Sequence, residues 1–244
     1  LTLNRPEALN ALSTELGEAL GARIDEVKRR AGDDIKALIV TGAGRAFCSG
    51  GDIKSMNAEQ RTPESQRARL KGSHNRMMDV LNMELPVISL VNGPAAGAGA
   101  NIALAADFVF ATPRAMFMQA FGRIGLVPDW GGFYVLPRLV GLQMAKELVF
   151  TARKVHAEEA KSLGMVHTIV QEQTALADTK AFARKFCQAS TTAIGIAKNI
   201  LNQSSNLDLR ALLEMEAAGQ AICAGSQYHR DAVKRFVDKT PLAF

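Results

Sequence analysis

Two runs of small residues could place backbone N–H groups around one ligand in this chain of 244 residues. The first run is the CSGGD of residues 48–52, and the second is the NGPAAGAGA of residues 92–100. Each run follows an apolar segment that we interpret as a buried strand. The second also opens an alanine-rich helix, whose first N–H groups have no partner within the helix and suit a phosphate or a developing oxyanion. The glycines of residues 92–107 are equally consistent with a tight strand-to-helix turn packed against a neighbouring strand.

One acidic residue, Asp129, lies in a third turn, the GLVPDWGG of residues 125–132. Two loops that converged on a carbonyl oxygen would form an oxyanion hole, in which the loss of one donor typically costs about 3 kcal/mol of transition-state stabilisation. A thioester held in this way becomes enolate-like, and a nearby carboxylate could move its α- or γ-proton. Asp129 could instead cap a helix that begins near Gly131. We find no Ser-His-Asp or Cys-His arrangement, because no serine or cysteine has a convincing partner in the sequence.

The VTGAG of residues 40–44 invites a dinucleotide-binding interpretation. That fingerprint needs a third glycine three residues after the second, at the start of a helix. Here the third position is Phe47, and the next glycines are Gly50 and Gly51. We therefore interpret residues 42–56 as a small-residue loop in which Ser49, Gly50 and Gly51 let N–H groups face a ligand.

The composition excludes several classes of protein. Hydrophobic residues make up 48% of the chain and charged residues 22%, as in ordinary globular proteins, and no apolar run reaches the roughly 18 residues of a membrane span. The odd, widely spread set of three cysteines predicts free thiols and a reducing compartment, either cytoplasmic or the mitochondrial matrix. The four histidines are isolated, which predicts no metal site. The net charge of +5 allows an anionic partner, but scattered basic residues and few aromatics argue against nucleic acid.

The hydrophobic periodicity predicts an α/β core over residues 1–173 and a helical region over residues 174–244. Predicted strands cover residues 1–3, 35–41, 87–91, 108–111, 115–120 and 165–170. Predicted helices cover residues 7–30, 73–83, 131–139, 142–150, 156–163, 175–189, 192–201, 207–224 and 227–238. Pro94 is expected to end the strand before it, because proline has no N–H to donate. The polar residues 57–71 predict a mobile flap beside the site or a plain solvated connection, and the opening LTL is typical of the middle of a strand whose beginning would precede Leu1.

Seven segments together resemble the crotonase family, the enoyl-CoA hydratases and isomerases, in their order and spacing. They are NRPEALNAL, AFCSGGDI, NGPAAGAGA, ADFVFAT, GLVPDWGG, LPRLVG and AEEAKSLGMV. Each segment alone is a weak signal, but seven in register over nearly the whole chain are a strong one. The resemblance implies an α/β fold, a crotonase-type spiral of ββα units with a C-terminal helical trimerisation region. It also implies self-association as a trimer or a hexamer.

The resemblance further implies a coenzyme A thioester as the substrate. Coenzyme A then belongs to the substrate, and no separate cofactor is expected. The backbone N–H groups of Ser49 and Ala98 would form the oxyanion hole. The coenzyme A side of the site would be lined by Ala8, Ala46, Asp52 and Ile53. Further substrate-binding positions would be Gly97, Asn101, Phe121 and Trp130.

The sequence departs from the hydratases at their two catalytic glutamates, because the matching positions are Asn101 and Phe121. Neither side chain can move a proton as a carboxylate, and addition of water to an enoyl thioester needs groups that activate that water. Asp129 lies where relatives with a GLxxD motif, the dienoyl-CoA and ring-type enoyl-CoA isomerases, place a catalytic aspartate. Apolar neighbours would raise its pKa and make it a better base. Asn101 could hydrogen-bond the substrate, position a water, or equally face a neighbouring loop.

The resemblance therefore predicts an enoyl-CoA isomerase that shifts a double bond, with Asp129 as acid and base. A hydratase or another crotonase-type reaction is the first alternative, and aromatic thioester dehalogenation with an aspartate nucleophile belongs to that group. A catalytically silent relative that binds coenzyme A or RNA is the second alternative, because both glutamates are missing.

Overall fold

The computed structural model describes residues 1–53, 62–241 and 244. Five parallel strands form its central sheet, in the order β1-β2-β3-β5-β8. Their bounds are β1 Thr2–Leu3, β2 Leu38–Gly42, β3 Val87–Val91, β5 Phe108–Ala111 and β8 Thr168–Ile169. The central strand β3 is buried at every position, as its mostly apolar sequence predicts for a sheet covered on both faces.

A second, three-stranded sheet has the order β4-β6-β7. Its strands are β4 Pro94–Ala96, β6 Met116–Met118 and β7 Lys154–His156. Pro94 was expected only to end a strand, but it begins β4 and pairs in parallel with Met116. The first residue of an edge strand tolerates proline because no ladder hydrogen bond is required from its nitrogen. The short strand β7 was not predicted either.

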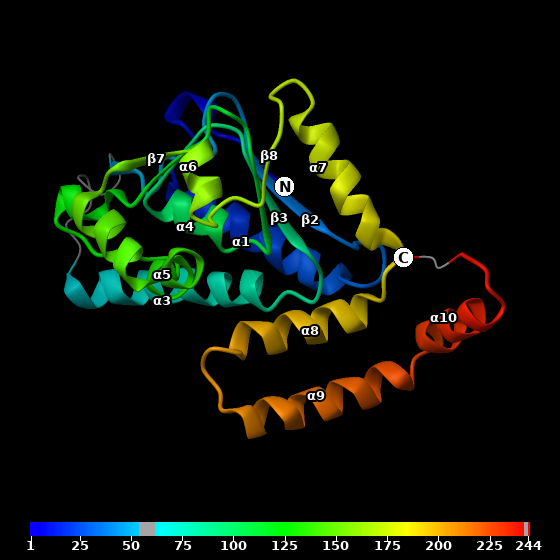
Figure 1. Cartoon of the computed structure of the whole chain (residues 1–244). Helices are drawn as coiled ribbons and strands as arrows, with labels where there is room; N and C mark the ends of the chain where they lie inside the picture. Colours follow the sequence, from blue (N-terminus) through cyan, green and yellow to red (C-terminus); the bar gives the residue numbers. More distant parts are fainter. Residues whose placement is uncertain (54–61, 242–243) are drawn as a thin grey trace.

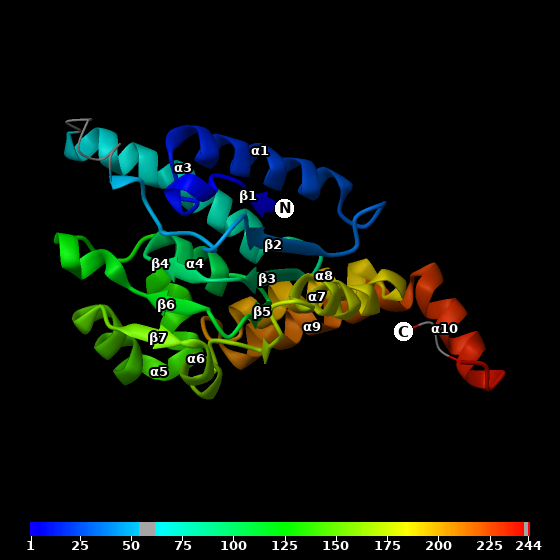
Figure 2. The same cartoon turned by 90° about the horizontal axis from the view of Figure 1, so that it is seen from above.

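Helices cover both faces of the central sheet (Figures 1 and 2). They are α1 Thr14–Arg30, α3 Pro63–Leu81, α4 Ala98–Leu104, α5 Gly132–Thr151, α6 Ala157–Ser162 and α7 Ala175–Arg184, with short 3₁₀ turns η1 Pro6–Ala8 and η2 Ala120–Ile124. Because side chains alternate along a strand, Val87 and Val91 of β3 face one apolar cluster with α1, α3, α4 and α5. Ile88 and Leu90 face a second cluster, which α7 covers.

Helices α1 and α3 each begin at a residue that follows a capping side chain, and α5 is broken at an internal glycine. The helix predicted from residue 7 begins at Thr14, because the Ser13 hydroxyl accepts a hydrogen bond from the Leu16 N–H and caps it. Helix α3 begins at Pro63 rather than residue 73, so the predicted polar connection is helical from there onward, and residues 57–61 of that prediction lie outside the described residues. The break predicted between the helices of residues 131–139 and 142–150 is confirmed, because α5 is interrupted at Gly141, whose backbone is not helical (φ 76°, ψ 160°).

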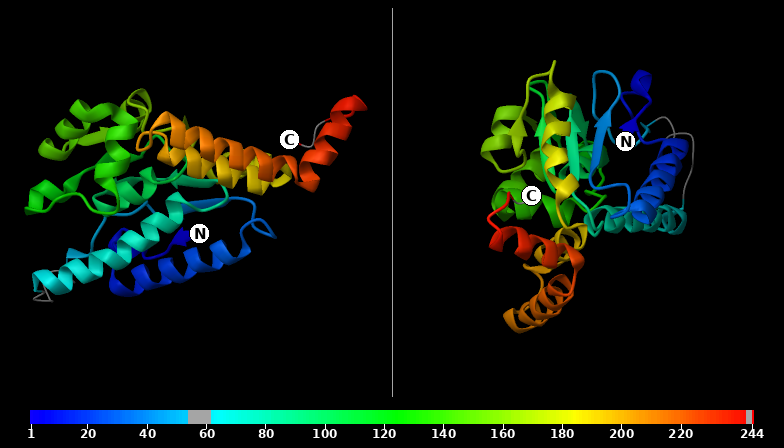
Figure 3. Two further views of the ribbon diagram at one scale, coloured as in Figure 1. Left: turned by 90° about the horizontal axis from the view of Figure 1, so that it is seen from below. Right: turned by 90° about the vertical axis from the view of Figure 1, so that its right-hand side faces the viewer.

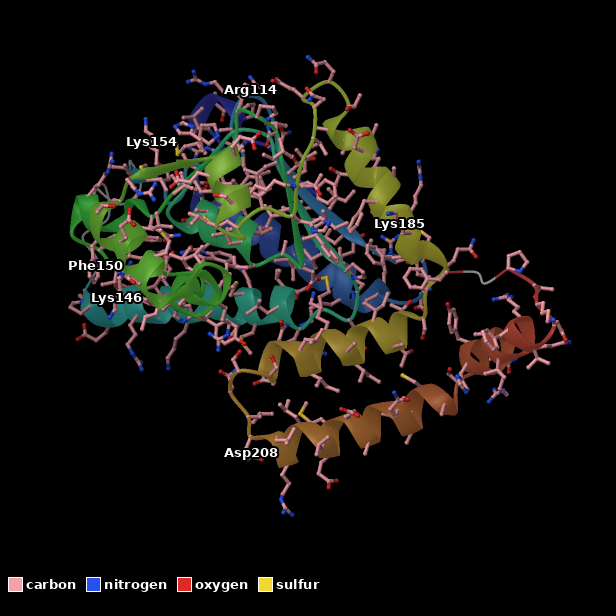
Figure 4. All side chains as sticks on the ribbon, viewed as in Figure 1. Arg114, Lys146, Phe150, Lys154, Lys185 and Asp208 are labelled. Carbon is pink, nitrogen blue, oxygen red and sulfur yellow. The ribbon has the colours of Figure 1, made fainter. Side chains whose placement is uncertain are left out.

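The chain from Ala175 onward is helical, as the periodicity predicts. After α7 come η3 Lys185–Gln188, α8 Thr191–Gln203, α9 Leu209–Ala224 and α10 Gln227–Val237. Helices α8 and α9 form a hairpin beside the core, and α10 projects beyond it (Figure 3). Asp208, labelled at the turn between α8 and α9 in Figure 4, caps α9 by accepting a hydrogen bond from the Ala211 N–H. The domain boundary predicted after residue 173 stays a prediction. Helix α7, which follows that position, packs on the sheet of the core.

One buried ion pair ties α8 to the α/β core. Lys198 Nζ lies 2.8 Å from Asp107 Oδ2, and its side chain is 7% exposed. The ammonium also donates to the carbonyl oxygens of Val80 and Leu85, while Asp107 accepts a hydrogen bond from the Val87 N–H. Burial lowers the pKa of Lys198 and raises the pKa of Asp107, although each charge favours ionisation of the other. Desolvation therefore outweighs the attraction, and the pair is sensitive to the loss of either partner.

Some features are absent from the described part of the chain. None of its helices is long and apolar enough to cross a membrane. Within residues 1–53, 62–241 and 244, no group of three metal-ligating side chains gathers at one place. The three cysteines are free thiols, with Cys48 buried and Cys187 exposed.

Candidate active site

A cavity of about 690 Å³ opens between α1, α3, the N-terminus of α4 and the turn before α5. Its lining is mostly apolar. Among its walls are the predicted site residues Ser49, Asp52, Ile53, Gly97, Ala98, Phe121, Asp129 and Trp130. The remaining predicted residues, Ala8, Ala46 and Asn101, lie outside this lining. The structure thus brings the two small-residue loops and the acidic turn to one place, as the sequence predicts.

The two small-residue loops lie directly against each other. Cys48 and Ala95 form a parallel bridge, and the Ala96 N–H donates to the Cys48 carbonyl over 2.9 Å. A Cβ on Gly99 would lie 2.3 Å from the Cys48 oxygen, and Gly50 adopts φ +94° with equally little room. The close approach that the glycines predict is therefore the approach of one loop to the other.

The backbone N–H groups of these loops differ in what they bind. Ala98 is the first residue of α4, so its N–H has no acceptor within the helix, and the residue lines the cavity. The Ser49 N–H, predicted as the second oxyanion donor, instead donates to the Leu9 carbonyl over 3.0 Å. This partner comes from the first turn of the chain, and no local pattern in the sequence indicates it.

Gly51 belongs to the loop whose N–H groups the sequence predicts to face a ligand, although the predicted oxyanion donor of that loop is Ser49. The Gly50 carbonyl accepts a hydrogen bond from the Leu12 N–H over 2.8 Å. A carbonyl and the following N–H belong to one planar trans peptide group and point in opposite directions. The Gly51 N–H therefore points away from Leu12, and both Gly50 and Gly51 line the cavity.

Asp129 is a half-buried residue on the cavity wall. The residue that caps α5 is Gly131, and no side chain caps that helix, so the interpretation of Asp129 as a cap is wrong. Its Oδ1 is buried and has no hydrogen-bond partner among the described residues. Burial raises its pKa to about 6, against the smaller opposing effects of the positive charges of Arg69 and His74 on α3. A carboxyl group with this pKa is half ionised near pH 6 and suits the transfer of protons near neutral pH.

Two aromatic residues complete the wall around Asp129. Trp130 is buried and has a left-handed backbone, with φ +46°. Phe121, on η2, packs against Gly97, where a Cβ would lie 3.6 Å from the ring. Both aromatic side chains belong to the lining of the cavity that Asp129 also lines.

Asn101 does not face the cavity. Its side-chain Nδ2 donates to the backbone carbonyl of Asp129 over 2.7 Å, and its Oδ1 accepts a hydrogen bond from Gln119 Nε2 over 2.8 Å. The residue is 1% exposed. Of the alternatives that the sequence leaves open, Asn101 therefore faces a neighbouring turn, and its prediction as a substrate-binding residue is corrected. Gln119 was not identified from the sequence.

The residues predicted for the coenzyme A side have different surroundings. Asp52 lines the cavity, but its Oδ2 pairs with Arg5 Nη1 over 2.6 Å. Ile53 lines the cavity with its side chain 66% exposed. Ala46 is buried and its carbonyl accepts a hydrogen bond from a buried asparagine, while the Ala8 carbonyl accepts one from the Ser49 hydroxyl. Ala8 and Ala46 thus support the loop from behind the cavity wall.

Known proteins resemble this chain over its whole length. Residues 1–244 match the family model described as enoyl-CoA hydratase/isomerase. The 1,2-epoxyphenylacetyl-CoA isomerase of Escherichia coli (strain K12) is 37% identical over 98% of this chain and 91% of its own. A probable enoyl-CoA hydratase of Rhodobacter capsulatus is 38% identical over 100% of this chain and 93% of its own. The crystal structure of an enoyl-CoA hydratase/isomerase from Cupriavidus metallidurans CH34 has a TM-score of 0.93 at 36% identity, covering 99% of this chain and 90% of that one.

Proposed function

The chain belongs to the enoyl-CoA hydratase/isomerase family and has its α/β fold, and from this premise we propose that it is an isomerase that shifts a double bond in an acyl-coenzyme A thioester. The observation that carries the proposal is the half-buried Asp129 on the cavity wall, whose carboxyl oxygen Oδ1 is buried and unpaired among the described residues. Of the other carboxylates among the described lining residues, Glu18 is exposed and Asp52 is paired with Arg5. One carboxylate is enough for a proton shuttle between two carbons.

The proposed reaction uses Asp129 twice. The thioester oxygen binds the N–H groups of Ala98 and Gly51, which stabilise the negative charge that develops there. Asp129 takes a proton from carbon 2 of a 3-enoyl thioester, and the electron pair moves into the carbonyl to give a dienolate. Asp129 then returns the proton to carbon 4, and the double bond lies between carbons 2 and 3. No atom is gained or lost, so the reaction consumes no water and no separate cofactor.

The test is turnover of a 3-enoyl-CoA and of crotonyl-CoA by the wild-type protein across pH. We expect isomerisation of the 3-enoyl substrate, with kcat/KM rising about tenfold per pH unit below the Asp129 pKa of about 6 and level above it. The sign follows from the base form, which is lost as the pH falls through 6. Efficient hydration of crotonyl-CoA would favour the hydratase alternative. Coenzyme A binding with no turnover of either substrate would favour a catalytically silent relative.

We further propose self-association as a trimer, or as a hexamer of two trimers, through the C-terminal helices. Support comes from large apolar side chains that α8, α9, α10 and the intervening turn expose. These are Leu201, Leu207, Leu209, Leu213, Ile222, Val233, Phe236 and Val237. Light scattering after gel filtration is expected to give three or six times the chain mass of 26.2 kDa. A particle of one chain mass at micromolar concentration would contradict this.

A further inference from the structure

A buried chain of hydrogen bonds ends at the turn that carries Asp129. Gln119 Nε2 donates to Asn101 Oδ1, and Asn101 Nδ2 donates to the Asp129 carbonyl, over 2.8 and 2.7 Å. The side chains of Asn101 and Gln119 are 1% and 4% exposed, and neither lines the cavity. The orientation of both amides follows from the acceptor: a backbone carbonyl accepts only, so Asn101 presents its nitrogen to the turn and its oxygen to Gln119.

The turn that receives this bond has an unfavourable backbone conformation. Trp130 and Gly131 both lie in the left-handed region, at φ +46° and +70°. For a residue as bulky as tryptophan that conformation costs on the order of 1–2 kcal/mol, so surrounding contacts must hold it. The Asp129 carbonyl accepts a second hydrogen bond from the Gly132 N–H over 3.0 Å. The peptide group that joins Asp129 to Trp130 is therefore fixed by one bond from the turn itself and one from Asn101.

The residues that surround the Asn101 amide leave room for it. A Cβ on Gly132 would lie 2.4 Å from Asn101 Nδ2, so only glycine leaves room for the amide at that distance. A Cβ on Gly131 would lie 2.6 Å from the Met77 side chain of α3. The turn is thus packed between the Asn101 amide and helix α3.

We propose that Asn101 is a positioning residue, whose amide, oriented by Gln119, fixes the turn that directs the Asp129 carboxyl group into the cavity. The proposal rests on the proposed role of Asp129 in the isomerase reaction. Asn101 itself touches neither the substrate cavity nor the reacting atoms. Its contribution is the placement of a proton-transfer group, where a displacement of about 1 Å can cost about 100-fold in rate.

The kinetic test is Asn101→Ala with Ser89→Ala as its matched control. Asn101→Ala is expected to lower kcat and kcat/KM together by about 10- to 100-fold, with KM nearly unchanged, because the lost contact positions a catalytic group and binds no substrate. Ser89 is also buried and donates through its hydroxyl to the α4 backbone at Ala103, so Ser89→Ala removes a similar bond on the same helix. It is expected to keep wild-type kcat. Gln119→Leu should lower kcat in the same direction as Asn101→Ala, by a smaller factor.

The second readout does not need turnover. Carboxyl-carbon NMR, with the Asp129 signal assigned by its loss in Asp129→Asn, should show titration near pH 6 in the wild type. In Asn101→Ala the pKa of Asp129 should fall toward the usual value of an aspartate, because the released turn admits water. The charged and titratable groups that face Asp129 or line its cavity are unchanged between the two proteins. These are Arg69, His74, Arg76, Glu18, Asp52 and Arg123.

Each outcome of these measurements has one meaning. An Asn101→Ala protein with wild-type kcat and wild-type Asp129 titration overturns the positioning role. A loss no larger than that of Ser89→Ala overturns it as well, because Asn101 would then act only on stability. If the wild type does not isomerise but the Asp129 titration still moves in Asn101→Ala, the positioning role stands and the proposed reaction is wrong.

Discussion

Replacing Asp129 by asparagine is expected to lower the isomerisation kcat by about 10²- to 10⁴-fold, the range of a lost general acid–base group. Asparagine has the same shape but cannot take up and return a proton. The wild-type Oδ1 has no hydrogen-bond partner within the described residues, so the exchange breaks no bond at that atom. Steady-state turnover of a 3-enoyl-CoA, with coenzyme A affinity measured separately by calorimetry, checks the prediction.

The same variant is expected to be more stable than the wild type at high pH. The folded-state pKa of Asp129 is raised to about 6 from 3.8, so its contribution to stability is full below pH 3.8 and is lost as the pH rises through 6. Asparagine stays neutral at every pH, so the variant does not lose stability in this way as the pH rises. Asp129→Asn should therefore unfold like the wild type at pH 4 and be more stable at pH 8, by at most about 3 kcal/mol.

The combination separates catalysis from folding. Lost turnover in a protein that is more stable at pH 8 cannot be attributed to unfolding. Glu18→Gln removes an exposed carboxylate on the lining of the same cavity and should keep most of the wild-type turnover. If Asp129→Asn isomerised at the wild-type rate, Asp129 would be a structural residue and the proposed mechanism would have no base.

Replacing Lys198 by methionine is expected to lower the free energy of unfolding by about 3–5 kcal/mol at pH 7.5, the usual cost of leaving one member of a buried ion pair without its partner. The Asp107 carboxylate, already raised in pKa by burial, would lose the ammonium 2.8 Å away. Its pKa would rise further, so the loss should shrink as the pH falls and the carboxylate takes up a proton. Urea unfolding at pH 7.5 and pH 5 measures both quantities.

A matched exchange on the surface provides the control. Lys28 on α1 pairs with Asp79 on α3, with the lysine side chain 43% exposed. Lys28→Met is therefore expected to cost less than about 1 kcal/mol, as exposed pairs do. Equal losses of unfolding free energy in Lys198→Met and Lys28→Met would show that burial does not increase the contribution of the Lys198 pair to stability. Asp107→Asn with Lys198→Met should recover part of the loss, because no charge is then left unpaired.

The parts of the fold that the sequence predicts well are those that local patterns determine. The predicted strands over residues 87–91 and 108–111 coincide with β3 and β5, because each is a mostly apolar run in a covered parallel sheet. Strand β4 was missed because its formation depends on pairing with β6, some 20 residues away. The start of α1 was misplaced because residues before Ser13 have helical periodicity but bend through left-handed positions at Leu9 and Asn10.

The candidate site also has features that the sequence predicts and features that it does not. The sequence places Asp129, Ala98 and Trp130 together, and all three line one cavity. It cannot tell which way an individual group points. The Ser49 N–H is directed to Leu9, and the Asn101 amide to the Asp129 carbonyl. Both directions depend on segments far away in the chain, and a single sequence carries no signal for them.

The Asn101 hydrogen bond also bears on how this site could be converted to one with paired carboxylates. In the hydratases that the chain resembles, the matching helix position carries a catalytic glutamate. A single Asn101→Glu change here would remove the donor that serves the turn and set a carboxylate against the Asp129 carbonyl, while position 121 still held phenylalanine. On the proposed mechanism, such a variant would lose the positioning of Asp129 without gaining the second of two paired carboxylates. Conversion of this site to two glutamates would therefore need several changes made together.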